Sequence, residues 1–125
     1  MLVGGDGAVL AERSNVVNTA RDVTGHPELA LAAWASHHLD AAERAAATMY
    51  TSCEHCAMCA AAHFWAGIGR LVFVLSGEQL GAHRGADWPA LALSSREVFA
   101  RGNNPDIVVE GPVDQLVPDA LALFA

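Results

Sequence analysis

The stretch ATMYTSCEHCAMCAAAHFWAGIGRLVFVL (residues 47–75) decides the fold. Its first part, Ala47–Ser52, favours a short strand, and its last part, Arg70–Leu75, is an apolar run typical of a buried strand. Between them, the small residues from about Cys56 to Gly67 favour a helix. Strand, helix and strand in this order predict a parallel crossover connection.

Upstream of this unit, the sequence predicts a hairpin and then a helix. The first residues form one strand, Asp6-Gly7 the turn, and Ala8 to about Glu12 the second strand. The polar residues from Arg13 to Thr24 predict a loop. We expect the helix to begin near His26, with Thr24 as its cap.

Downstream, the pattern continues to alternate between helix and strand. We expect irregular structure over Ser76–Pro89, a short helix over Ser94–Arg101, a last strand over Ile107–Glu110 and a terminal helix over Leu116–Phe124. This alternation predicts an α/β fold, a three-layer α/β/α sandwich around a mixed five-stranded sheet. A length of 125 residues predicts one domain, residues 1–125.

Composition restricts the classes of partner. The sequence has 14 acidic and 7 basic residues, a formal charge of −7, which disfavours binding to long nucleic acids. No apolar run approaches the roughly 20 residues of a membrane span, and the first ten residues do not resemble a secretory signal. We therefore expect a soluble, cytoplasmic protein without membrane contact.

The three cysteines fall within seven residues, Cys53 to Cys59, which favours metal binding over a disulfide framework. Cys56 and Cys59 lie one turn apart at the start of the expected helix, where unpaired N–H groups favour thiolates. If a second helix start brings His26 beside them, one nitrogen and two sulfurs can bind a zinc ion.

Three protein ligands would leave a fourth coordination position for water, whose pKa zinc lowers to about 7. Glu28, two residues after His26, is a candidate catalytic proton shuttle in that arrangement. The simpler alternatives are a helix-start glutamate and a closed structural zinc site that includes Cys53.

His26-x-Glu28 followed by Cys56-x-x-Cys59 resembles the zinc-deaminase signature. The segment YTSCEHCAMCAAAHFWAGIGRLVF (residues 50–73) is similar to that of bacterial guanine deaminases and tRNA adenosine deaminases, within the cytidine-deaminase-like superfamily. The resemblance implies one zinc per subunit and hydrolytic deamination of a small nucleobase, nucleoside or related heterocycle, with a guanine-like base as the first expectation. It also implies a homodimer or higher homo-oligomer.

Further similarities and departures concern the substrate side. AERSN, ending at Asn15, is similar to the segment with the family's base-binding asparagine, although an asparagine there could merely close a turn. Pro27 replaces the usual alanine and has no N–H to donate, so base recognition must differ. His55 stands where the family usually has proline, and could contact substrate or point to solvent. Trp88 and Phe124 are candidates for the pocket wall.

The family's usual first helix and a Pro-Phe-Gly-Ala segment have no counterpart here, so we expect one packing layer to be thin. A shortened chain, a covering partner subunit or a smaller variant would each account for this. The alternatives to a small-base deaminase are a tRNA adenosine deaminase and a non-catalytic domain with structural zinc. The sequence assigns no role to the remaining histidines, which are His37, His38, His63 and His83.

Overall fold

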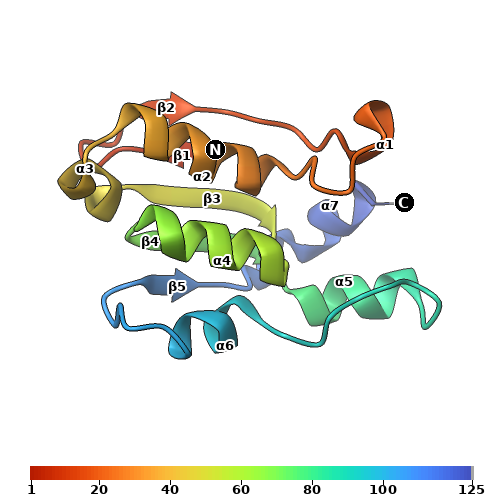
Figure 1. Cartoon of the computed structure of the whole chain (residues 1–125). Helices are drawn as coiled ribbons and strands as arrows, with labels where there is room; N and C mark the ends of the chain where they lie inside the picture. The colour runs from red at the N-terminus through yellow and green to blue at the C-terminus, as the bar shows by residue number, and fades with distance from the viewer. Residues whose placement is uncertain (125) are drawn as a thin grey trace.

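The computed structural model describes residues 1–124 and confirms the predicted α/β class with a mixed five-stranded sheet (Figure 1). The strand order is β2-β1-β3-β4-β5. β1 is antiparallel to β2 and β3, whereas β3, β4 and β5 are parallel. The strands span Leu2–Val3 (β1), Val9–Ala11 (β2), Thr48–Cys53 (β3), Arg70–Leu75 (β4) and Val108–Glu110 (β5).

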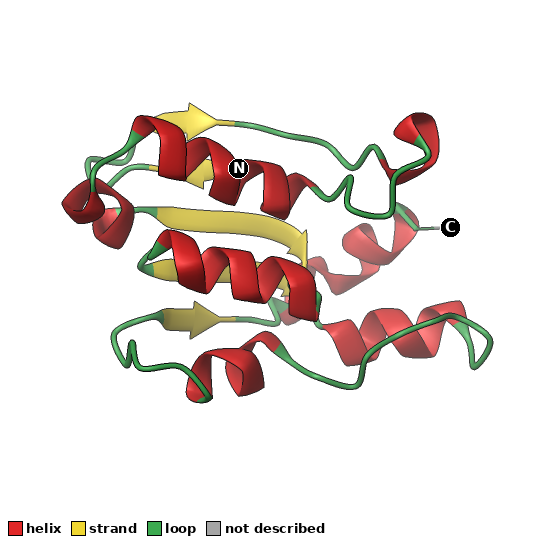
Figure 2. Cartoon of the chain, viewed as in Figure 1, coloured by secondary structure: helices red, strands yellow, loops and turns green. Residues whose placement is uncertain are grey.

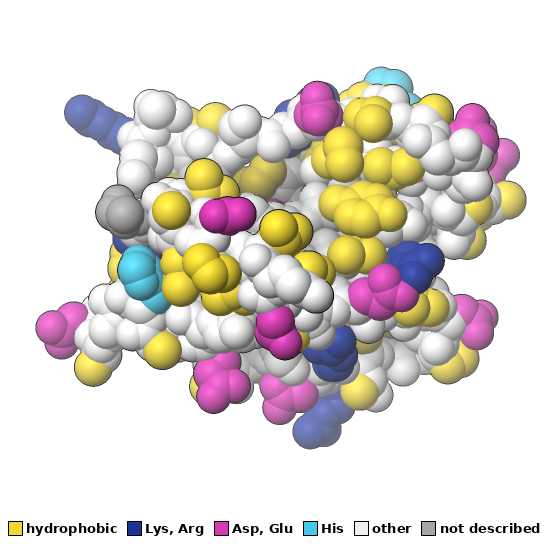
Figure 3. All heavy atoms as spheres, turned by 180° about the vertical axis from the view of Figure 1, so that it is seen from behind, with side chains coloured by type: hydrophobic (Ala, Val, Ile, Leu, Met, Phe, Trp, Pro, Cys, Tyr) yellow, Lys and Arg dark blue, Asp and Glu magenta, His cyan; other side chains and the backbone are white. Residues whose placement is uncertain are grey.

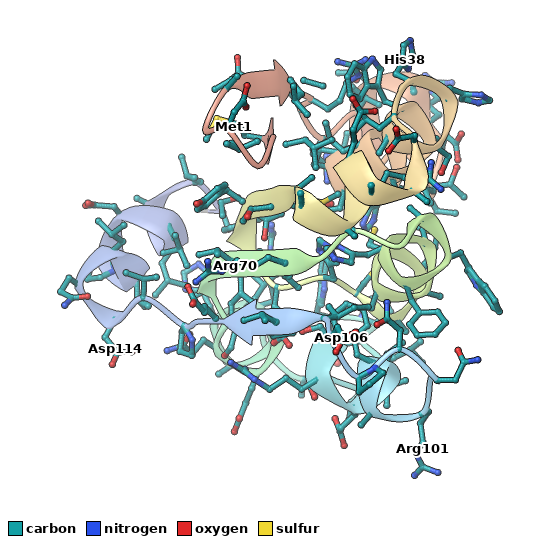
Figure 4. All side chains as sticks on the ribbon, turned by 90° about the vertical axis from the view of Figure 1, so that its left-hand side faces the viewer. Met1, His38, Arg70, Arg101, Asp106 and Asp114 are labelled. Carbon is teal, nitrogen blue, oxygen red and sulfur yellow. The ribbon has the colours of Figure 1, made fainter. Side chains whose placement is uncertain are left out.

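The helices form two layers of unequal size (Figure 2). Helices α2, α4 and α6 cover one face of the sheet, and α7 packs against β4 from the other, as the view along the strands shows (Figure 4). Within residues 1–124, no helix has the length and apolarity required to cross a membrane. The helical elements are Val17–Ala20 (α1), Pro27–His38 (α2), Ala41–Ala46 (α3), Ala57–Ala66 (α4), Gly77–Arg84 (α5), Ser95–Ala100 (α6), Asp114–Leu116 (η1, a 3₁₀ turn) and Val117–Ala122 (α7).

The two faces of the sheet are buried to different extents. Along β3 and β4, Met49, Leu71 and Phe73 point to the helix-covered face and are at most 1% exposed. On the opposite face, Tyr50 and Val108 are 41% and 49% exposed, and apolar side chains gather on the surface there (Figure 3). The layer that contains α7 is therefore thin, as the sequence predicts.

Three expectations about local structure are wrong. Ser76–Pro89 is not irregular throughout, because Ser76 and Gln79 form a capping box that starts α5. The predicted loop before His26 contains the one-turn helix α1. Thr24 does not cap α2, because its backbone N–H and its hydroxyl both donate to Asp22, and His26 occupies the N-cap position.

Replacing Gly69 with alanine is expected to lower the free energy of unfolding by at least ~2 kcal/mol. The added Cβ would collide with the carbonyl oxygen of Ala45, a backbone atom that cannot move away cheaply. Gly81→Ala is the matched control, because Gly81 lies in α5 and a Cβ there meets no atom within 4 Å. That variant should keep or gain stability, since alanine favours helix. Urea unfolding measures both, and equal midpoints would contradict the prediction.

Candidate metal centre

Helices α2 and α4 both begin at the same end of the sheet, where β3 ends (Figure 1). His26 is the N-cap residue of α2 and Cys56 is the N-cap residue of α4, and neither side chain makes a capping hydrogen bond. Cys59 lies one turn into α4 and is buried. The predicted meeting of two helix starts is therefore present, and its side chains remain available to a ligand.

The distances among these side chains fit zinc. His26 Nδ1 lies 3.7 Å from Cys56 Sγ and 3.5 Å from Cys59 Sγ, and all three ligand atoms lie within 4.8 Å of one another. A tetrahedral zinc ion with Zn–N and Zn–S bonds of about 2.0 and 2.3 Å requires N···S distances of about 3.5 Å. His26, Cys56 and Cys59 are thus positioned to hold a metal ion.

Cys53 does not belong to this group of possible ligands. Burial and the nearby carboxylates of Glu28 and Glu54 raise the pKa of Cys53 to about 12, which keeps it a thiol. A closed site with three cysteines, the structural-zinc alternative, is therefore not formed within residues 1–124.

Cys56 is the more acidic of the two ligand cysteines. A hydrogen bond from Cys59 lowers the pKa of Cys56 to about 5, with further help from backbone N–H groups at the start of α4 and from His26. The same hydrogen bond, together with burial, raises the pKa of Cys59. Cys56 is thus the thiol of the pair that ionises more readily.

Glu28 lies beside the cysteines, as predicted. Its Oε2 atom is 4.0 Å from Cys59 Sγ, and it occupies the first turn of α2. Burial raises the pKa of its carboxyl group. The arrangement therefore places a partly buried carboxyl group beside the three possible metal ligands.

Two hollows lie beside the start of α2. A cavity of about 90 Å³ includes Pro27, Glu28 and Tyr50 in its lining, and a wider hollow of about 330 Å³ includes His26 and Leu29. Arg13 lines both hollows. Sequence reasoning placed Arg13 only in a loop, since an isolated arginine after a strand carries no motif.

Asn15 lies next to the wider hollow, between Ser14 and Val16, which line it. Its side-chain oxygen accepts a hydrogen bond from the N–H of Val17 at 3.0 Å, so it does close a turn. The N–H of Val16 donates to Gly25 at 2.9 Å, which holds this loop against the residue before His26. The two amide N–H donors of Asn15 and the second lone pair of its oxygen remain available for other contacts.

His55 is turned into the core, and the alternative that it points to solvent is wrong because it is only 3% exposed. Its Nε2 atom lies 3.1 Å from Nδ1 of the fully buried His63, whose Nε2 lies 3.0 Å from the Ile68 carbonyl oxygen. Sequence reasoning missed this histidine pair, since the spacing of His55 and His63 along the chain matches no known motif. The other unassigned histidines, His37, His38 and His83, are exposed.

Trp88 and Phe124 come together around one cation. The guanidinium carbon of Arg84 lies 4.6 Å from the ring centroid of Trp88 and 5.5 Å from that of Phe124. Neither aromatic residue belongs to the lining of the two hollows described above. Both rings thus lie beside Arg84, and their place in the pocket wall stays a prediction.

The chain is similar to known deaminases. Residues 1–75 match the model of the cytidine and deoxycytidylate deaminase zinc-binding region. The chain is 35% identical over 112 residues to a probable cytosine deaminase of Schizosaccharomyces pombe, covering 83% of this chain and 67% of that protein. It is 43% identical over 61 residues to the guanine deaminase of Bacillus subtilis, covering 49% of this chain and 39% of that protein.

Other similarities extend to RNA deaminases and to solved structures. The chain is 38% identical over 68 residues to the tRNA-specific adenosine deaminase of Agrobacterium fabrum, covering 54% and 45% of the two proteins. A structure from studies of A-to-I editing by tRNA deaminases superposes with a TM-score of 0.61 at 27% identity, covering 99% of this chain and 81% of that one. The structure of a protein in complex with 8-azaguanine has a TM-score of 0.67 at 23% identity, a likeness of fold, covering 94% and 64%.

Metal analysis of purified variants tests the ligand set. We expect about one zinc per chain in the wild type, and strongly reduced zinc in His26→Ala, Cys56→Ser and Cys59→Ser, because each change removes one of three ligands. Cys53→Ser is the matched control and should retain zinc, since this thiol lies outside the group. Loss of zinc from the Cys53 variant would show that the assigned ligands are incomplete.

Proposed function

The chain belongs to the cytidine and deoxycytidylate deaminase zinc-binding family, and we propose that it hydrolyses an exocyclic amino group from a small nucleobase, nucleoside or related heterocycle. The observation that carries this proposal is the open three-ligand site with a carboxylate 4.0 Å from one of its thiols. A structural zinc site would use four protein ligands and would need no such acid.

In the proposed reaction, water adds to the ring carbon that bears the amino group, the C–N bond breaks, and ammonia leaves. When bound, zinc supplies Lewis acidity, which lowers the pKa of water to about 7. Glu28 takes one proton from the attacking water and delivers it to the ring nitrogen. It then takes the second proton from the new hydroxyl group on the carbon and passes it to the departing amino group. Its partly buried position beside Cys59 suits short proton transfers within one site.

A guanine-like base is the first candidate substrate. Relatives that act on guanine and cytosine support a small planar substrate, and Asn15 would orient it through its amide N–H groups. Pro27 lines the cavity beside Glu28 but has no N–H to donate. It would therefore contact the base through its pyrrolidine ring. His55 is buried against His63, which argues against direct contact with the substrate.

A tRNA adenosine deaminase is the second candidate, favoured by the similarity to the Agrobacterium fabrum enzyme. It would share the same ligands and the same acid. The formal charge of −7 speaks against it, because anticodon-arm binding depends on Lys and Arg neutralising phosphates. Binding to tRNA that weakens steeply with salt would favour this candidate over the first.

We also propose a homodimer or higher homo-oligomer in the cytoplasm. The exposed apolar side chains on the thinly covered face of the sheet, such as Tyr50 and Val108, support self-association.

Glu28→Gln is expected to lower the rate of ammonia release by about 10²–10⁴-fold, because the amide cannot accept and return the proton. Zinc content should be unchanged, since Glu28 is not a ligand. The measurement is a screen of free bases, nucleosides and tRNA with the wild type and the variant. Undiminished turnover by a zinc-loaded Glu28 variant would remove this residue from the mechanism.

A further inference from the structure

Glu54 lies in the short loop between the end of β3 and Cys56, two residues before that ligand. Its Oε2 accepts a hydrogen bond from the N–H of Gly77 at 3.0 Å. Its Oε1 accepts two, from the N–H and the hydroxyl of Ser95 at 2.9 and 2.6 Å. One carboxylate thus receives three donors that come from residues 23 and 41 positions away.

These donors are the first residues of two helices. Gly77 begins α5 and Ser95 begins α6, and the first N–H groups of a helix have no partner within it. Ser76 and Ser94 satisfy the third N–H of each helix through their own capping boxes. Glu54 satisfies the first N–H of each helix, and its negative charge strengthens these bonds.

The loop that carries Glu54 also contacts β4 and α4. The N–H of Glu54 donates to the Leu75 carbonyl oxygen at 2.7 Å, and the adjacent His55 side chain is fixed against His63 in α4. Ser95 is fully buried, so the carboxylate bonds to a part of the fold that cannot shift freely. The metal-site loop is therefore attached to β4, α4, α5 and α6 through two consecutive residues.

We propose that Glu54 is a positioning residue of the metal site. By binding the starts of α5 and α6, it fixes the loop that carries Cys56 and so sets where Cys56 Sγ lies relative to His26 and Cys59. Cys56 is the ligand that most needs such support, because it is exposed and stands at the N-cap, whereas Cys59 is buried within α4. The inference rests on the metal site alone and not on the proposed substrate or reaction.

Two adjacent serines provide a matched test. Ser95→Ala removes the hydroxyl that bonds to Glu54, whereas Ser94→Ala removes only the local cap of α6. The measurements are the zinc Kd, by competition with a chromophoric chelator, and the visible absorption spectrum of the Co²⁺-substituted protein. Circular dichroism confirms that each variant is folded at the temperature used.

We expect Ser95→Ala and Glu54→Gln to weaken zinc binding by about tenfold or more and to change the cobalt spectrum, as loss of outer contacts does at other metal sites. Ser94→Ala should lower Tm but leave the zinc Kd within about twofold of the wild type. The double variant Glu54→Gln/Ser95→Ala should be less impaired than the sum of the single effects, because both changes act on the same hydrogen bonds.

Two results would overturn the proposal. One is an unchanged zinc Kd and cobalt spectrum in folded Ser95→Ala, which tests the contact even where the Glu54 variant does not fold. The other is equal weakening by Ser94→Ala and Ser95→Ala, which would attribute the loss to general destabilisation of α6. Neither measurement involves turnover. The test of Glu54 therefore remains valid even if no deaminase activity is found.

Discussion

The meeting of the α2 and α4 starts is the constraint on which the rest of the structure depends. The parallel crossover from β3 through α4 to β4 places α4 beside α2 on one face of the sheet. Small buried residues, among them Ala32, Ala35 and Ala66, let the two helices approach closely. Because both helices begin at the same end, a nitrogen from one and two sulfurs from the other come within ligand distance of a common point.

The helices differ in whether a side chain at their N-cap position makes a capping hydrogen bond. The short helices α3, α5 and α6 each begin with a complete capping box, which stabilises segments too short to be stable helices on their own. The two helices of the site begin with His26 and Cys56, whose side chains make no capping bond. A residue suited to capping typically contributes about 1 kcal/mol to helix stability, a contribution that His26 does not make to α2.

Sequence reasoning succeeded where a signal is local. The LVFVL run defined β4 to the residue, and the spacing of His26, Glu28, Cys56 and Cys59 identified the metal group. Helix α5 was missed because the glycines of its segment suggested a loop, although Ser76 and Gln79 have capping-box spacing. The contacts of Glu54 and the His55–His63 pair could not be predicted, since they depend on how distant helices pack rather than on any pattern along the chain.

The choice of thiols at the start of α4 follows from charge balance. Each helix start carries a partial positive charge, of about half a unit, and two of them point at the place where a divalent cation would sit. Neutral ligands alone would leave that ion facing two positive poles. If Cys56 and Cys59 hold such an ion as two thiolates, their charges would offset its two positive charges, and the centre would be close to neutral beside the two helix starts.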